Sequence, residues 1–227
     1  MKLPPATPAL ALLLATGCTP VQMRLPAVPP ESTETVVLNG IVNDDEGRFT
    51  LAGSEDSYAR GAGYSWFGSV TQLRGGAAFV ARGDAFAGEL SAQCRSSATD
   101  IGGGFITLRA QKMAYRCDYA RDRQPIEARL VLDERVALLD ERRGFIELNG
   151  VRIDLRSEHH VQASLLTVPM PAGYVFSVGG QVIGAIDLNG RSKRVLLPRD
   201  PRLREAALAA ALSLSLFIDA GIGEASG

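Results

Sequence analysis

The side chains of this chain that are most able to form covalent or metal bonds are three cysteines and two histidines. The cysteines are Cys18, Cys94 and Cys117, and the histidines are the neighbours His159 and His160. An odd number of cysteines in an exported protein needs an explanation, because disulfides use cysteines in pairs. A separate role for Cys18 would leave Cys94 and Cys117 as an even pair.

Cys94 and Cys117 flank a glycine-rich turn and the apolar run from Phe105 to Met113. A bond between the two cysteines would close a loop of about two dozen residues, worth roughly 3 kcal/mol of stability in the chain-entropy model. The alternatives are a redox pair or a metal site, but the Cys-x-x-Cys spacing that would favour them is missing. We therefore predict a structural disulfide, which persists in an oxidising compartment.

His159 and His160 follow two acidic residues, Asp154 and Glu158. Adjacent residues on a strand point to opposite faces, so the two imidazoles cannot easily share a metal ion. Glu158 and His160 would share a face and are the candidates for a zinc site, which needs a third ligand from elsewhere. A Ser-His-Asp hydrolase would need an activated serine, and the chain lacks the Gly-x-Ser-x-Gly elbow. We expect neither a stoichiometric metal nor a catalytic residue here.

Residues 1–17 have the order of a secretory signal. Lys2 provides a positive charge, an apolar run extends from Ala9 to Ala15, and the small residues Thr16 and Gly17 follow. A positive end, an apolar stretch and a small-residue cleavage site are typical of signal peptides. The apolar run is much shorter than the roughly 20 residues that a membrane-spanning helix needs, so we expect no permanent span there.

The residues Leu14-Ala15-Thr16-Gly17-Cys18 resemble the lipobox of bacterial lipoproteins. This resemblance implies that Cys18 receives a diacylglyceryl group, that residues 1–17 are removed and that the new amino terminus is acylated. Thr19, in place of an aspartate, resembles the sorting pattern for the outer membrane. Two or more acyl chains hold a protein stably at a membrane where one chain does not. The alternative is ordinary cleavage after Gly17, which would release the protein into the periplasm.

Residues 18–35 comprise the cysteine and a proline-rich, polar segment without the period of a strand or a helix. Such a composition is typical of a flexible linker. The remaining residues, 36–227, are enough for one large domain or two small ones. We therefore expect a tether of 18–35 between the lipid and a single globular domain of 36–227.

From Val36 onwards, short apolar runs alternate with turn residues. Asn39-Gly40, Asn149-Gly150 and Gly179-Gly180 supply the positive φ angles that tight hairpin turns require. The segment from Val151 to Arg156 alternates apolar and charged residues, which is typical of an antiparallel strand with one buried face. Counting such runs predicts a mainly β domain, an antiparallel barrel or sandwich of about a dozen strands.

The C-terminal part of the chain has a different pattern. Asp200 is a good N-cap, and Pro201 suits the first position of a helix. No charged residue occurs from Ala206 to Ile218, and a helix that is apolar on all sides is buried in a core or in a membrane. Because the run is too short to span a bilayer, we expect a helix of 201–219 buried in the core of the β domain.

The hairpin from Phe176 to Ile186, followed by the apolar helix from Ala206 to Ile218, resembles the end of the tubby-like fold. That group includes tubby C-terminal domains and phospholipid scramblase-related proteins. The resemblance implies a closed antiparallel barrel that surrounds a hydrophobic C-terminal helix. No phosphoinositide-binding residue matches position by position, and a fold does not fix a function, so the resemblance implies no activity.

Charge and composition exclude some classes of partner. The net charge is −1 and the arginines are scattered among acidic residues, so we expect no nucleic-acid partner. The glycines at 102–104 lack the phosphate-loop pattern, and we expect no cofactor. We predict a non-enzymatic lipoprotein of the cell envelope, at the periplasmic face of the outer membrane, that binds an envelope protein or a lipid or serves a structural role. Two alternatives stay open: a carrier of lipids or apolar ligands, and a small hydrolase or metalloprotein that uses His159 or His160.

Overall fold

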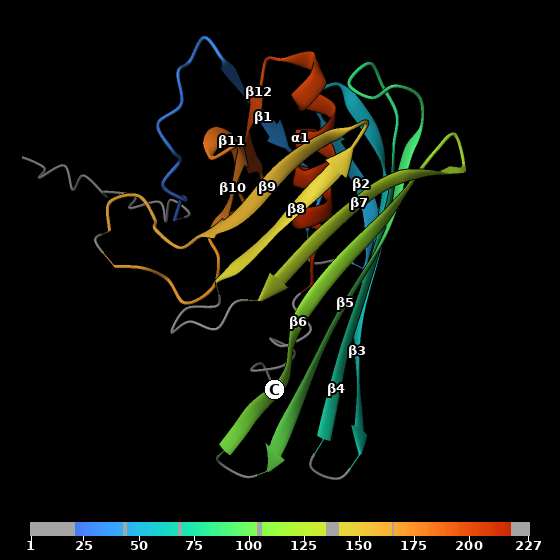
Figure 1. Ribbon diagram of the computed structural model, residues 1–227, viewed down its shortest axis with the longest axis vertical. Coiled ribbons are helices and arrows are strands. Elements are labelled where there is room, and N and C mark those ends of the chain that lie inside the picture. The colour runs from blue at the N-terminus through green and yellow to red at the C-terminus, as the bar shows by residue number, and fades with distance from the viewer. Residues whose placement is uncertain are drawn as a thin grey trace, which may run out of the picture.

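The computed structural model describes residues 21–42, 45–67, 70–103, 106–134, 141–164 and 166–218. Within them lie twelve β-strands and one α-helix (Figure 1). The elements are β1 (Thr33–Leu38), β2 (Glu46–Leu51), β3 (Ser54–Phe67), β4 (Val70–Ala81), β5 (Leu90–Gly103), β6 (Ile106–Arg121), β7 (Gln124–Glu134), β8 (Arg142–Leu148), β9 (Val151–Glu158), β10 (Gly173–Val178), β11 (Gln181–Asp187), β12 (Lys193–Pro198) and α1 (Pro201–Ser215).

The twelve strands form one antiparallel sheet that curls into a nearly closed barrel. Their order follows the chain from β2 to β12, and β1 lies beside β12. The two ends of this order meet where Asn39 and Thr50 exchange two backbone hydrogen bonds of 3.0 Å. Closure of the sheet removes edges that could pair with other chains. The predicted β class is confirmed, and of the two predicted architectures the chain adopts the barrel.

Strand β9 shows why the alternating residues form a barrel wall. Ile153 and Leu155 are buried in the core, while Arg152 on the other face is exposed. The turn before β9 consists of Asn149 and Gly150, with φ angles of 54° and 73°. These positive φ angles match the right-handed twist of a two-residue hairpin, as the Asn-Gly pair predicts.

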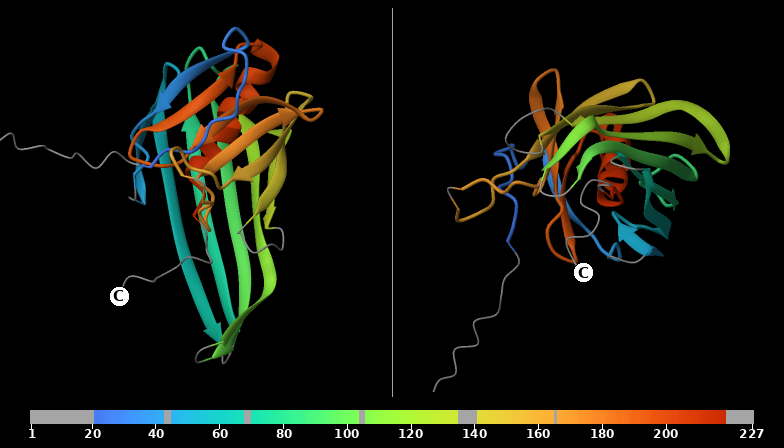
Figure 2. Two further views of the ribbon diagram at one scale, coloured as in Figure 1. Left: turned by 90° about the vertical axis from the view of Figure 1, so that its left-hand side faces the viewer. Right: turned by 90° about the horizontal axis from the view of Figure 1, so that it is seen from below.

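The helix α1 lies inside the barrel, as the view along the barrel shows (Figure 2). The side chain of Asp200 accepts a hydrogen bond of 2.9 Å from the backbone N–H of Arg202, and Pro201 takes the first helical position. All ten residues from Ala206 to Ser215 are buried. The predicted buried helix is confirmed, but it ends at Ser215 instead of residue 219, and Asp219 lies outside the described residues.

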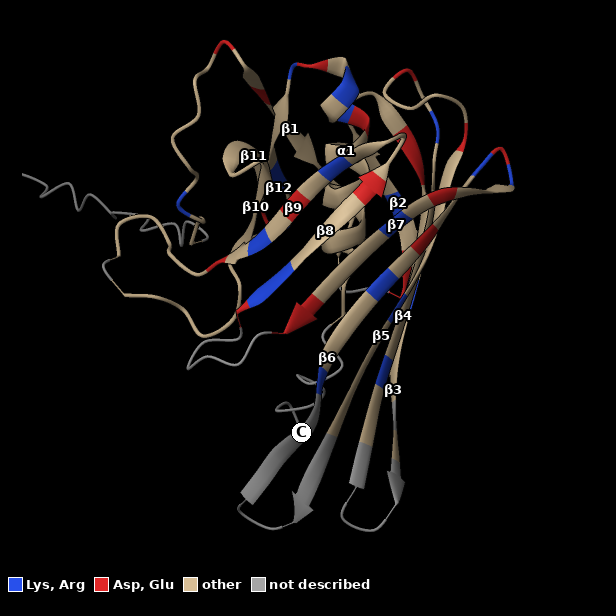
Figure 3. Ribbon diagram, in the orientation of Figure 1, with Lys and Arg blue, Asp and Glu red and all other residues tan. Residues whose placement is uncertain are grey.

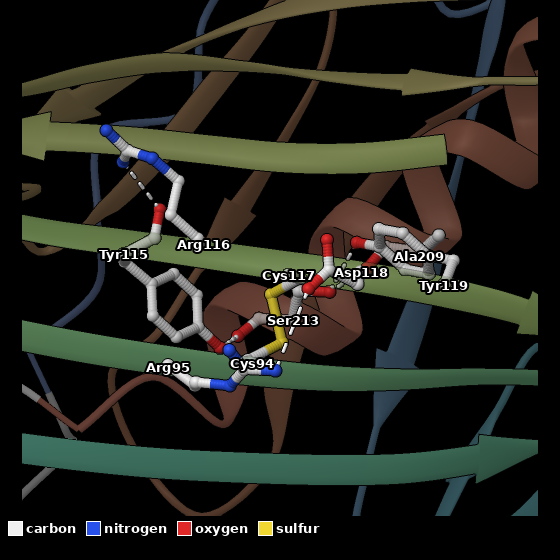
Figure 4. Close-up of a disulfide and its surroundings, with 9 residues drawn as sticks. All are labelled: Cys94, Arg95, Tyr115, Arg116, Cys117, Asp118, Tyr119, Ala209 and Ser213. Atoms are coloured by element: carbon white, nitrogen blue, oxygen red, sulfur yellow. Dashed lines mark hydrogen bonds and ion pairs between the residues drawn. A yellow bond between two sulfur atoms is a disulfide. The ribbon is translucent and has the colours of Figure 1, made fainter. Parts of the chain in front are cut away.

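Two tyrosines on the inner face of β6 bind the helix through Ser213 (Figure 4). The Tyr115 hydroxyl donates to the Ser213 carbonyl at 2.8 Å, and the Tyr119 hydroxyl lies 2.7 Å from the Ser213 hydroxyl. Because the Ser213 hydroxyl itself donates to the carbonyl of Ala209 at 2.8 Å, Tyr119 is the donor. Burial raises the pKa of both tyrosines, which keeps their hydroxyls protonated as donors.

The disulfide joins Cys94 on β5 to Cys117 on β6 and lies between these two tyrosines on the inner wall. The two cysteines face each other directly in the register of the strands, and both are buried. The structure thus contains the bond that the sequence predicts. Its place beside Tyr115 and Tyr119 means that it reinforces the part of the wall to which the helix is attached.

Strands β3 to β6 are the longest of the sheet and extend beyond the rest of the barrel (Figures 1 and 2). Strand β2 pairs with β3 only as far as Ala59, and β7 pairs with β6 only from Ala114 to Arg121. The four strands therefore form a ribbon at one end of the molecule. In the part of the chain that the structure describes, no helix is both long and apolar enough to cross a membrane.

We predict that α1 is required for folding. The Leu212 side chain is fully buried, so Leu212→Asp would bury an unpaired charge that costs several kcal/mol, against a total stability of about 5–15 kcal/mol. The cooperative melting transition, measured by circular dichroism on a soluble form that begins at Thr19, should disappear. Truncation after Pro198 should have the same result.

Arg202→Asp is the matched control, because it introduces the same side chain at an exposed position of the same helix. It should leave the melting temperature nearly unchanged. Cooperative melting of the Leu212→Asp protein close to the wild-type temperature would show that α1 is peripheral.

Candidate functional site

The described chain begins with a short segment that docks on the outside of the barrel. Met23 forms an isolated antiparallel bridge with Val161, and its side chain is fully buried. The backbone N–H of Gln162 donates to the carbonyl of Gln22 at 2.7 Å. We call residues 21–25, together with the described residues 159–164 and 166–172 between β9 and β10, the clasp.

A small apolar cluster, separate from the core around α1, holds the clasp on the wall. Its buried members are Met23, Val161, Ala172, Val175 and Ala185, with Leu25, Val168, Val182 and Leu196 packed around them. Gly173 permits the close approach, since a Cβ atom there would lie 2.4 Å from the sulfur of Met23 and 2.0 Å from the carbonyl oxygen of Ile186. A larger residue at position 173 would therefore displace the segment or the strand.

The buried carboxylate of Asp187 joins the docked segment to the barrel. One oxygen, Oδ2, accepts the backbone N–H of Met23 at 3.1 Å and the guanidinium of Arg194 at 2.9 Å. The other oxygen accepts the backbone N–H and the side-chain amide of Asn189 at 3.0 and 2.9 Å. The same Asn189 amide donates to the carbonyl of Ala172 at 3.1 Å. A buried charge is tolerated only when it is paired and hydrogen-bonded, and here its partners tie three chain segments together.

His159 holds the base of the β9–β10 loop and is buried. Its Nδ1 lies 3.0 Å from the carbonyl of Val168, which can only accept, so Nδ1 carries the proton. Its Nε2 lies 3.0 Å from the hydroxyl of Ser157, which also accepts the backbone N–H of Arg142 at 2.9 Å. The serine and histidine are in contact, but both are buried and both ring nitrogens have structural partners. The arrangement positions a loop and offers no nucleophile to a substrate.

Glu158 and His160, the candidates for a zinc site, do lie together. The Glu158 carboxylate is 2.6 Å from Nδ1 of His160 and accepts the backbone N–H groups of His159 and His160 at 2.9 Å each. Burial alone would raise the pKa of the Glu158 carboxyl, but these hydrogen bonds and the His160 charge lower it. His159 is buried and His160 exposed, so the two imidazoles diverge. Among the described residues, no group of three or more metal-ligating side chains comes together.

Cys18 lies outside the described residues. Only Thr19 and Pro20 separate it from Val21, where the described chain begins. Even a fully extended chain spans at most about 3.5 Å per residue, so a lipid on Cys18 would be attached within about 10 Å of the clasp.

Part of the stretch 18–35, which the sequence predicts to be a flexible tether, contacts the barrel. Met23 bridges to Val161, and β1 starts at Thr33, slightly before the expected domain boundary at 36. The composition of the segment does not reveal this docking, because the surface that contacts Met23 exists only after β9, β10 and β11 have assembled. A sequence signal for the docking is the presence of the apolar side chains Met23 and Leu25 in this proline-rich stretch.

The interior of the barrel is occupied by α1, and a pocket lies beside the last turn of this helix. Its volume is about 710 Å³, and its lining includes Arg60, Arg191, Lys193, Leu214 and Phe217. Lys193 donates to the carbonyl of Ile41 at 2.9 Å, and Arg60 to the carbonyl of Val42. Burial, and next the charge of Arg60, lower the pKa of Lys193. Two of the three cations are therefore already engaged by the chain's own carbonyl oxygens.

No family model, curated protein or solved structure matches this chain. The order of elements, a barrel followed by an internal helix, agrees with what the tubby-like resemblance implies, but membership of that group stays a prediction. The function must therefore be argued from the site itself.

We predict that Met23→Asp releases the clasp and leaves the barrel folded. Burial of a methionine side chain is worth about 1.5–3 kcal/mol, and the new carboxylate would be repelled by Asp187. At about 2–4 °C per kcal/mol for a domain of this size, the melting temperature should fall by about 3–12 °C. Hydrogen-exchange mass spectrometry should show lost protection in the peptides that cover 21–25 and 159–172 only.

Ala27→Asp is the control, because Ala27 is exposed just beyond the docked segment. Its exchange pattern should equal that of the wild type. Unchanged protection of both clasp peptides in Met23→Asp would mean that the methionine does not hold the segment.

Proposed function

We propose that this protein is an exported lipoprotein of the bacterial cell envelope, anchored through Cys18, whose barrel is a non-enzymatic binding or structural module. The leader of residues 1–17 and the odd cysteine support the anchor. The disulfide between Cys94 and Cys117 fits an oxidising compartment such as the periplasm. The observation that carries the proposal is the docked segment at Met23, which would keep a lipid on Cys18 within about 10 Å of the clasp.

The filled interior supports a rigid module over a carrier. A carrier of the lipocalin type keeps a cavity inside its barrel for the ligand. In this chain the ten buried residues of α1 take that space. The buried contacts of His159 and the missing third ligand beside Glu158 and His160, among the described residues, support a non-enzymatic role over a hydrolase or metalloprotein.

The proposed location is the periplasmic face of the outer membrane. Thr19, directly after the lipidated cysteine, supports this destination, and secretion into the periplasm after ordinary cleavage is the alternative. An envelope protein or a lipid is the proposed class of partner, in keeping with a nearly neutral surface that lacks a basic stripe.

Lipidation can be tested directly by expression in a bacterium supplied with labelled palmitate. We predict that the wild type is labelled and that Cys18→Ser is not, because the thiol and the new amino terminus are the only acyl acceptors that the lipobox provides. The double variant Cys94→Ser/Cys117→Ser is the matched control and should stay labelled. Equal labelling of the wild type and Cys18→Ser would refute the anchor.

A further inference from the structure

The exposed large apolar side chains of the described residues are not spread evenly. They are Val21, Val37, Val42, Leu166 and Met170. Three of the five belong to the clasp, and Leu166 is the most exposed of all, at 78%. Scattered single apolar residues need no explanation, but a group of them beside one structural feature marks a contact surface.

The loop that carries two of these side chains contains histidines but no residue that is charged at every physiological pH. Between Glu158 and Asp187 the sequence contains no Asp, Glu, Lys or Arg. Figure 3 shows this stretch, with the β9–β10 loop projecting from the side of the barrel. Because the stretch contains no Asp, Glu, Lys or Arg, its removal from water avoids the large cost of desolvating a permanently charged side chain.

The loop is held in place by hydrogen bonds at its base. The backbone N–H of Ala172 donates to the carbonyl of Glu158 at 2.8 Å, and that of Val168 donates to the carbonyl of His159 at 2.9 Å. The docked segment adds a further contact, since the guanidinium of Arg24 donates to the carbonyl of Ser164 at 3.1 Å. Leu166 and Met170 therefore lie close in sequence to residues that are hydrogen-bonded to the barrel or to the docked segment.

Arg24 adds a positive charge at the edge of this surface. Its side chain is exposed, and the nearby carboxylate of Glu158 is paired with His160. Cationic side chains next to apolar ones are favoured at a membrane surface, where they meet lipid phosphate groups. The clasp thus combines apolar tips with a cation that an anionic lipid headgroup would complement.

We propose that the clasp is the face with which the anchored protein contacts the bilayer, and that Leu166 and Met170 enter the boundary between headgroups and acyl chains. This inference rests on the proposed lipid anchor at Cys18, which a chain of at most about 10 Å would keep next to the clasp. The acyl chains hold the protein at the membrane, and the clasp fixes which side of the barrel faces it. The β3–β6 ribbon then lies away from the loop that meets the bilayer (Figure 1).

The test uses the full lipidated protein reconstituted in vesicles of phosphatidylethanolamine and phosphatidylglycerol. A polarity-sensitive dye is attached to Leu166→Cys or Met170→Cys, which is selective because the other cysteines are bonded or lipidated. The control is Ser97→Cys, an exposed position on β5, across the barrel from the clasp. We expect a blue shift and a several-fold rise in emission at 166 and 170, quenched by lipid-borne nitroxide, and neither change at 97.

The outcomes separate the inference from the function on which it rests. If the protein carries no lipid and does not float with the vesicles, the lipoprotein proposal fails and the inference fails with it. If the lipidated protein floats with the vesicles while the dyes at 166 and 170 report water as the dye at 97 does, the inference alone is overturned. Burial of all three dyes would also overturn it, since the contact would then not be specific to the clasp.

Discussion

The enclosure of α1 is the constraint on which the rest of this structure depends. The helix has no charged side chain from Ala206 to its end at Ser215, so every face of this part must be kept from water. Twelve strands provide that cover, and they can do so because the edges of the sheet meet at Asn39 and Thr50. Two buried serine hydroxyls are satisfied within the helix by carbonyls four residues earlier, and Ser213 also receives the two tyrosines of β6. The buried part of the helix is thus apolar except for two serines, whose hydroxyls are hydrogen-bonded.

Local patterns were enough to predict the elements that make up this core. Alternation in β9, the Asn149-Gly150 turn and the uncharged helix each specify their structure within a few residues, and all three are found in the barrel. The disulfide between Cys94 and Cys117 followed from counting cysteines. The Leu-Ser repeat from Leu212 to Leu216, which alternates like a strand, is nevertheless helical up to Ser215. It continues an alanine-rich helix, and its two serine hydroxyls donate to carbonyls four residues earlier.

The clasp could not be predicted, because its parts are distant in sequence. Met23 meets Asp187 across 164 residues, and the receiving surface exists only when β9, β10 and β11 are paired. Likewise, no local pattern around His159 indicated that the folded chain would bury this side chain between Ser157 and Val168. Both features depend on non-local packing, which overrides composition. Both features lie in the clasp, on the side of the barrel next to the proposed anchor. The barrel interior is filled by α1, and the β3–β6 ribbon extends from one end.

The central claim, that the barrel is a solid body built around its own helix, is tested most directly by native-state hydrogen exchange. If α1 is the core, the amide groups of Leu208 to Leu212 should exchange only through global unfolding, with the same free energy as the amide of Tyr115 in β6. Helix amides that exchange with a clearly smaller free energy than those of β6 would show that α1 leaves the barrel while the wall stays folded. That result would contradict the account and would make the interior available to a ligand.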